Sequence, residues 1–299
     1  MAILPSQVAH LVNPLVSVDQ LASSSSSIDG IPSDLETSIR YAAQKLTQAA
    51  GVLLRLPQDT IAQAIVLFTR FWLGSEGGSL AVHAAKDASA ASLYLAAKLS
   101  FLPTSPRSVL NVYAFLLSPN ASPLSFINSG QPPDAPDPEA YYVSEGQYQS
   151  GRDAMMKMES TILRTLGFQT HVALPHTVAL TYLQTLGAAS PAVSRRVFEH
   201  LNAALFSPQL LYVTHQPNAL AVAAIYLAAR EKGTKLVDSE WWEVFDVDRE
   251  ELGFLVVAMM SVENFAISEH EKWKGRPVPM SVVEVEEELK KRRILENGK

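Results

Sequence analysis

Two charged residues lie within helical patterns that are otherwise apolar. Lys98 stands near the end of the stretch Ala88 to Leu99 (ASAASLYLAAKL), which is apolar or small on almost every side. Glu159 falls inside the apolar stripe of a second helical pattern, residues 145 to 168. Burial of an unpaired charge is costly, so each group must reach water or meet a partner. The pattern therefore favours binding chemistry: an ion pair within the chain, or hydrogen bonds to another molecule.

Residues suited to catalysis form no recognisable motif. The absence of cysteine excludes disulfides, zinc ribbons and thiolate catalysis. The closest histidines, His171 and His176, have a spacing that does not suit one helix face, and Pro175 lies between them, so we interpret both as loop or cap residues. No H-E-x-x-H, G-x-S-x-G, P-loop or kinase motif is present. We expect a binding module rather than an enzyme, with no catalytic residues, metal or cofactor.

Composition also restricts the class of partner. The chain has 299 residues and a net charge of -6, whereas nucleic-acid binding requires clustered basic residues. The longest apolar run, Leu252 to Met260, is shorter than the ~20 residues of a membrane span. The N-terminus has no basic region typical of a signal peptide. We expect neither direct nucleic-acid binding nor a membrane partner.

Helical periodicity and one internal repeat define the organisation. Ser92 to Lys98 (SLYLAAK) returns as Ala224 to Arg230 (AIYLAAR), and no strand alternation is credible anywhere. The sequence predicts an all-α protein of two units with about five helices each. We predict that residues 34 to 168 and 171 to 267 superpose, with Leu93 to Lys98 on Ile225 to Arg230.

Less regular segments flank and interrupt these units. Residues 1–33 form an N-terminal extension with a Ser-rich linker that is flexible by composition. Ser33 to Glu36 has the spacing of a capping box. A Pro-rich insertion occupies 118–140, and the charged C-terminal tail, 268–299, is predicted to be a solvated helix. Four apolar residues predict a short amphipathic helix in the extension: Leu11, Leu15, Val18 and Leu21.

Several short motifs occur along residues 28 to 265. They are Ala49 to Gln58 (AAGVLLRLPQ), Val66 to Phe71 (VLFTRF), Leu166 to Val172 (LGFQTHV), Gln216-Pro217 and Ile225 to Arg230 (IYLAAR). Together they resemble the cyclin L family of the cyclins, and the stretch LLRLPQ is the most discriminating part.

The resemblance implies two tandem five-helix cyclin folds. It also implies a nuclear regulatory subunit that binds and activates a cyclin-dependent kinase acting in RNA polymerase II transcription and pre-mRNA splicing, with splicing or transcription factors as further partners. In this family a Lys and a Glu of the first cyclin box bind the kinase, and Lys98 and Glu159 match them. Leu99, Leu163 and Phe168 match the apolar kinase-contact positions beside them.

The sequence departs from the cyclin pattern in three places. Leu99-Ser100-Phe101 follows Lys98 where Ile-Glu-Glu is usual, so this loop is expected to contact a partner differently. Ile39 to Ala43 (IRYAA) and Leu46 stand where cell-cycle cyclins have a substrate-docking patch, which disfavours docking of Arg-x-Leu motifs. No Arg-Ser-rich tail, typical of long cyclin L forms, precedes Lys299.

Two other classes of protein remain open alternatives. TFIIB-like transcription factors also contain two cyclin folds, but they bind DNA and TATA-binding protein and usually have a zinc ribbon and a basic face. The third class is an unrelated helical enzyme. At the level of the site, an ion pair between Lys98 and Glu159 that serves only the fold is the alternative to kinase binding.

Overall fold

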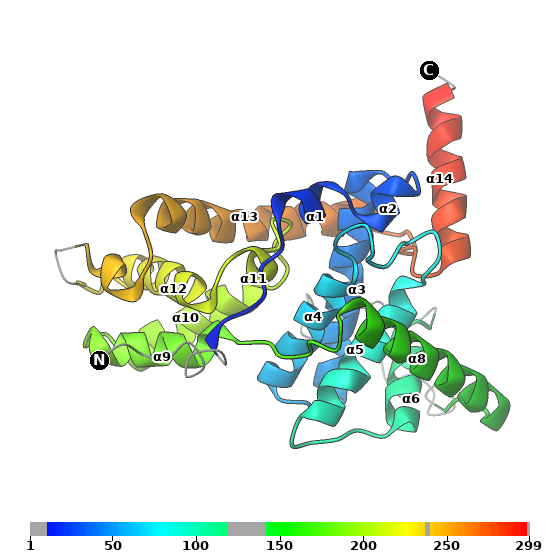
Figure 1. The fold of residues 1–299 in the computed structure, drawn as a ribbon, viewed down its shortest axis with the longest axis horizontal. Coiled ribbons are helices and arrows are strands. Elements are labelled where there is room, and N and C mark those ends of the chain that lie inside the picture. The colour runs from blue at the N-terminus through cyan, green and yellow to red at the C-terminus, as the bar shows by residue number, and fades with distance from the viewer. Residues whose placement is uncertain (1–10, 119–141, 237–239, 298–299) are drawn as a thin grey trace. The chain divides into compact units, whose positions relative to one another are not determined.

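The computed structural model describes residues 11–118, 142–236 and 240–297, and within these ranges the secondary structure is helical without strands (Figure 1). This confirms the all-α prediction. The chain divides into two compact units, which we name after their central helices. The α5 unit comprises Val18–Thr170 and Trp273–Lys299, and the α12 unit comprises Met1–Ser17 and His171–Lys272. The predicted insertion, apart from residue 118, lies outside the described residues.

The α5 unit is built around a helix made mostly of small residues. α5 contacts four neighbours, α3, α4, α6 and α8. Ala88, Ala91 and Ala96 on α5 are fully buried, so neighbouring backbones can approach closely. The helices of this unit are α1 (Val18–Ala22), α2 (Ser25–Ile28), α3 (Ser33–Leu53), α4 (Gln58–Phe71), α5 (Ala85–Leu99), α6 (Pro106–Leu116), α8 (Glu145–Thr165) and α14 (Val282–Asn297).

The α12 unit is also built around a small-residue helix. α12 contacts α9, α10, α11 and η4, and Ala221, Ala224 and Ala228 on it are fully buried. Its elements are α9 (Pro175–Thr185), α10 (Pro191–Ala204), α11 (Leu211–Thr214), α12 (Pro217–Glu231), the 3-10 helix η4 (Trp241–Phe245) and α13 (Arg249–Trp273), whose last residue belongs to the α5 unit.

Helix α13 extends beyond the end predicted for the second unit. Its length and composition would suffice to cross a membrane. These two properties do not by themselves indicate a membrane span, because core helices of soluble proteins meet the same criterion. The uninterrupted apolar run is short, but the helix carries few charges over a longer stretch.

The N-terminal extension differs from its prediction. Residues 12–17 are not helical, and only Val18–Ala22 forms the predicted helix. Asn13 instead joins the α12 unit, because its side chain donates to the Ala173 carbonyl and accepts from the Ala173 N–H, both at 2.8 Å. Gln216 bonds the backbone of Asn13 at 3.0 Å. The Asn13 side-chain amide thus bonds both backbone groups of Ala173, as a neighbouring backbone segment would, and this fixes the N-terminal segment. Helical periodicity does not predict these bonds.

The serine run is ordered and largely enclosed rather than a flexible linker. Ser26 is fully buried, and its Oγ accepts the Leu80 N–H at 3.1 Å. Ser24 caps α2 and donates to Glu36 at 2.8 Å. The capping box predicted at Ser33 is therefore wrong: α3 begins at Ser33 without a side-chain cap, and Glu36 binds Ser24 instead.

The C-terminal tail forms the predicted helix, but it is anchored rather than fully solvated. The Trp273 indole N–H donates to the buried Ser38 hydroxyl at 2.6 Å. Arg292 on α14 pairs with Asp34 on α3 at 2.7 Å, and Val285 is buried. The dense charges of this segment concealed the few apolar residues that anchor it.

Candidate functional site

Lys98 lies at the edge of the α5 unit, in the last turn of α5. Its ammonium is at the helix C-terminus, where a cation interacts favourably with the helix dipole. The side chain is 39% exposed, and its Nζ lies 4.8 Å from the centre of the Tyr94 ring. Such a position allows a cation–π contact. Lys98 is thus held in place while part of its side chain faces water.

Glu159 enters the same edge from α8. It lies between the buried residues Met155 and Ile162, and its side chain is only 8% exposed. The carboxylate Oε1 accepts a hydrogen bond from the Lys98 ammonium. The charge within an apolar stripe therefore has a partner, as its burial requires. The two residues are 61 positions apart in the sequence, and their pair joins α5 to α8.

This ion pair fits both interpretations of the two charges. An ammonium has three donors and a carboxylate two acceptor oxygens, so one mutual bond leaves further capacity on each group. The pair can consequently fix α5 against α8 and still bind another molecule.

The three apolar residues predicted to contact the kinase lie near this pair in the sequence, but their side chains differ in exposure. Leu99 is 57% and Phe168 69% exposed, whereas Leu163 is partly buried. The Phe168 N–H donates to the Leu163 carbonyl at 2.8 Å, and the Gly167 N–H donates to the Arg164 carbonyl at 3.1 Å. These two bonds, with the positive φ of Gly167 and Phe168, form a Schellman motif at the end of α8. The motif brings the backbones of Leu163 and Phe168 together.

The structure adds two apolar residues to this edge. Phe101 and Leu102, in the turn after α5, are 102% and 54% exposed. The departure from Ile-Glu-Glu after Lys98 marked this loop, but only the structure shows that both side chains face solvent. Sequence patterns do not give the exposed fraction of an aromatic side chain beside a predicted contact site.

The other predicted positions give no alternative site in the described part of the chain. His176 Nε2 lies 3.0 Å from Asn202 Oδ1, and His171 is exposed in the segment before α9. No group of metal-ligating side chains is found among the described residues. On α3, Ile39 and Leu46 at the docking-patch positions are fully buried.

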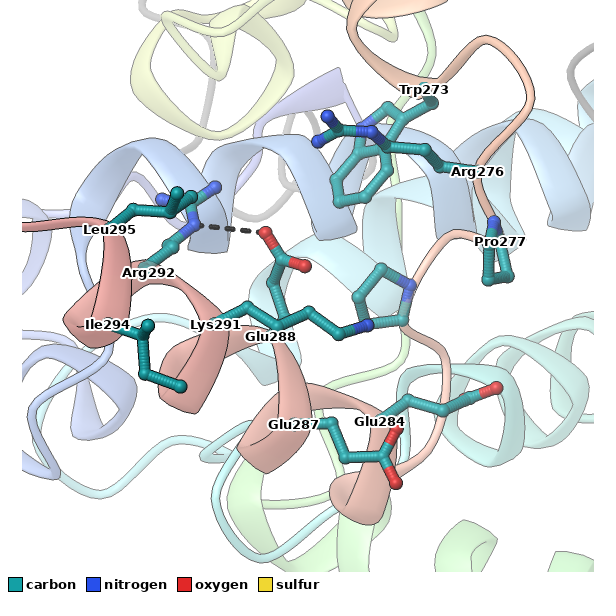
Figure 2. A pocket seen from close by; sticks show the side chains of 11 residues that line it. Trp273, Arg276, Pro277, Glu284, Glu287, Glu288, Lys291, Arg292, Ile294 and Leu295 are labelled. Atoms are coloured by element: carbon teal, nitrogen blue, oxygen red, sulfur yellow. Dashed lines mark hydrogen bonds and ion pairs between the residues drawn. The ribbon is translucent and has the colours of Figure 1, made fainter. Parts of the chain in front are cut away.

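A separate pocket of about 460 Å³ lies between α14 and the segment that precedes it. Figure 2 shows Trp273 and Pro277 on one side and Glu288 and Leu295 on α14. Its lining mixes carboxylates with arginine and lysine, so its charge favours no one class of ligand. None of the five predicted site residues lines it.

Comparisons with known proteins agree with this fold. No protein-family model matches the chain. Cyclin-L2 of Homo sapiens is 32% identical over 244 residues, covering 81% of this chain and 43% of the relative. Cyclin-L2 of Mus musculus is 31% identical over 246 residues, with the same coverage. Cyclin-L1 of Homo sapiens is 30% identical over 240 residues, covering 80% and 42%. The match spans less than half the length of these relatives.

A solved structure shows the same fold at low sequence identity. The crystal structure of the yeast RNA Pol II CTD kinase CTDK-1 complex contains a chain that matches with a TM-score of 0.65 and 13% identity. The match covers 95% of this chain and 84% of the other.

Two helical units, each built around a small-residue helix, and this structural likeness define a protein with tandem cyclin folds. The sequence likeness then narrows the class. The chain belongs to the cyclin family and is a homologue of cyclin-L1 and cyclin-L2.

Proposed function

We propose that the chain is a nuclear regulatory subunit that binds and activates a cyclin-dependent kinase, and that this kinase acts in RNA polymerase II transcription and pre-mRNA splicing. The observation that carries the proposal is the homology to cyclin-L1 and cyclin-L2 across about four fifths of the chain. The structural match to a chain of an RNA polymerase II CTD kinase complex supports the transcriptional part.

The proposed kinase-binding residues are Lys98, Leu99, Glu159, Leu163 and Phe168. Lys98 would donate to backbone carbonyls beside the kinase αC helix, and Glu159 would accept backbone N–H groups there. The Lys98–Glu159 bond supports this role, because it orders both groups before binding and so reduces the entropy lost in the complex. Backbone partners would also make recognition independent of the kinase's side chains.

Activation would follow from the requirements of the kinase. An active kinase pairs the lysine of its third strand with the glutamate of αC, and αC must be held inward. A rigid helical edge that binds the inward position better than the outward one shifts the kinase toward its active state. The cyclin thus contributes no catalytic group of its own.

The test is pairwise co-expression with a panel of cyclin-dependent kinase catalytic subunits. Complexes are isolated by size-exclusion chromatography, and kinase activity is measured on an RNA polymerase II CTD peptide. One kinase is expected to bind and to gain activity, while the chain alone transfers no phosphate. ATP turnover by the pure chain would contradict the proposal, and salt-sensitive DNA binding without a kinase would favour a TFIIB-like factor.

Substitutions at the ion pair test the binding edge itself. Lys98→Ala or Glu159→Ala is expected to weaken kinase binding by about 2–5 kcal/mol, the usual cost of removing one partner of a buried charged hydrogen bond. Arg230→Ala, at the matching position of the α12 unit, is the control and should bind normally. Unchanged affinity together with a large loss of stability would show that the pair serves only the fold.

A further inference from the structure

The turn between α5 and α6 presents apolar side chains to solvent immediately after Lys98. Phe101 is 102% exposed, and Leu99 and Leu102 are 57% and 54% exposed. The turn connects the C-terminal end of α5 with α6 in Figure 1. Packing within the chain does not explain a fully exposed phenylalanine, because the side chain gains no burial in the folded state.

Hydrogen bonds hold this turn in one conformation. The Ser100 N–H donates to the carbonyls of Ala96 and Ala97 at 3.1 and 3.2 Å. The Ser100 hydroxyl donates to the Ala97 carbonyl at 2.9 Å and accepts the Leu102 N–H at 3.1 Å. Phe101 therefore lies between two residues whose backbones are fixed to the end of α5. The exposed ring is presented by an ordered turn rather than by a loose loop.

The corresponding segment after α12 is polar. Arg230 is followed by Glu231, Lys232, Gly233 and Thr234, with Gly233 at a positive φ of 64°. A helix that shares the repeated stretch thus ends without an apolar turn in the other unit. A unit built around such a helix therefore does not require an apolar turn at this position.

We propose that this turn is a specificity-determining contact for the kinase catalytic subunit, with Phe101 inserted into an apolar pocket of the kinase. The inference rests on the proposed function, since it extends the Lys98–Glu159 edge along the chain to Leu102. Only Leu99 belongs to the contact positions expected from the family resemblance, and Phe101 and Leu102 are additional. The partner must therefore have an apolar pocket next to the backbone groups that bind Lys98 and Glu159.

The physical reasons favour a protein surface as the occupant. A rigid aromatic side chain buries a large area at a small entropic cost, and aromatic residues are frequent among those that dominate interface affinity. A neighbouring ion pair of limited exposure supplies directional hydrogen bonds that an apolar ligand could not use. A kinase that carries polar groups in place of this pocket would be rejected, because those groups would lose water without gaining hydrogen bonds.

The experiment measures affinity for the kinase selected by co-expression, using the full chain and purified kinase. Phe101→Ala is expected to lower affinity about ten-fold or more, and Leu102→Ala to lower it less. The thermal midpoint of the free chain should not change for either variant, since neither residue is buried. Val244→Ala, which truncates a side chain 78% exposed on η4, is the matched control and should leave affinity unchanged.

The outcomes separate this inference from the function on which it rests. If Lys98→Ala weakens binding and Phe101→Ala does not, the turn contact is wrong and the kinase edge remains. If neither variant changes the affinity of a kinase that does bind, both the edge and the turn are wrong. If no kinase subunit binds the chain, both proposals fall.

Discussion

The two central helices share a similar stretch, SLYLAAK in α5 and AIYLAAR in α12, but end in different surroundings. At the end of α5, Lys98 binds the buried Glu159 and precedes an exposed apolar turn. At the end of α12, Arg230 is exposed, and the next residue, Glu231, pairs with Arg196 on α10 and has its Oε1 3.2 Å from His200 Nε2. The small residues shared by the two helices maintain the core of each unit. The residues after the shared stretch distinguish the two units, because those after Lys98 include exposed apolar side chains and those after Arg230 are polar.

The largest expected effect concerns what the two helices share. Leu93 on α5 and Ile225 on α12 are both fully buried, so replacing either by Ala removes methyl groups from a packed core and leaves a cavity. Each variant is expected to lose about 2–5 kcal/mol of unfolding free energy, measured by chemical denaturation. Val244→Ala is the exposed control and should change stability by less than about 0.5 kcal/mol. If only one of the two helices tolerated truncation, their equivalence as central helices would be broken.

Repetition and periodicity were sufficient to predict the helical class, and local capping residues mark several helix starts. Ser105, Ser144 and Ser190 cap helices, and in α6 and α10 a proline follows the cap directly. These features depend on neighbouring residues, so they are visible in the sequence. The hydrogen bonds that fix Asn13 are made to Ala173, which is 160 positions away in the sequence. No local sequence pattern predicts them.

Part of the site was also predictable, because it depends on neighbouring residues within one helix. Glu159 was identified as a charge inside an apolar stripe, and Lys98 as a charge near the end of a small-residue helix. Resemblance supplied their proposed common role. Their contact and the full exposure of Phe101 depend on how α5, α8 and the following turn pack in three dimensions. No spacing rule for a single helix contains that information.

A medium effect is expected where the two helix ends differ. Lys98→Ala removes the partner of a carboxylate that is 8% exposed, whereas Arg230→Ala truncates an exposed side chain. A buried charge without its partner is destabilising, but the 39% exposure of Lys98 admits water and reduces the effect. We expect a loss of about 1–2 kcal/mol for Lys98→Ala and less than about 0.5 kcal/mol for Arg230→Ala.

The double variant sharpens that comparison. Glu159→Gln removes the charge that Lys98→Ala leaves unpaired, so adding it to Lys98→Ala should recover part of the lost unfolding free energy. The coupling is measured as a double-mutant cycle by chemical denaturation. Strictly additive losses would show that the pair contributes nothing as a pair, and Lys98 would then resemble Arg230.

The smallest effect is expected at Glu231, the acidic residue beside Arg230. Hydrogen bonding from Arg196 lowers the pKa of Glu231 below its ordinary value of 4.5. A carboxyl whose pKa is lowered by folding stabilises the folded state above its unfolded pKa, and this contribution is lost as pH falls through the folded pKa.

The side chains of Arg196 and Glu231 are both more than a third exposed, so water and salt screen the interaction. Glu231→Gln should therefore cost about 0.2–1 kcal/mol at pH 7, less at high salt, and nothing below the folded pKa. Thermal unfolding of the wild type and the variant across pH and salt measures this difference. A loss at Glu231 as large as that of Lys98→Ala, and insensitive to salt, would mean that both units contain a buried charged edge, and the contrast between α5 and α12 would no longer identify the binding side.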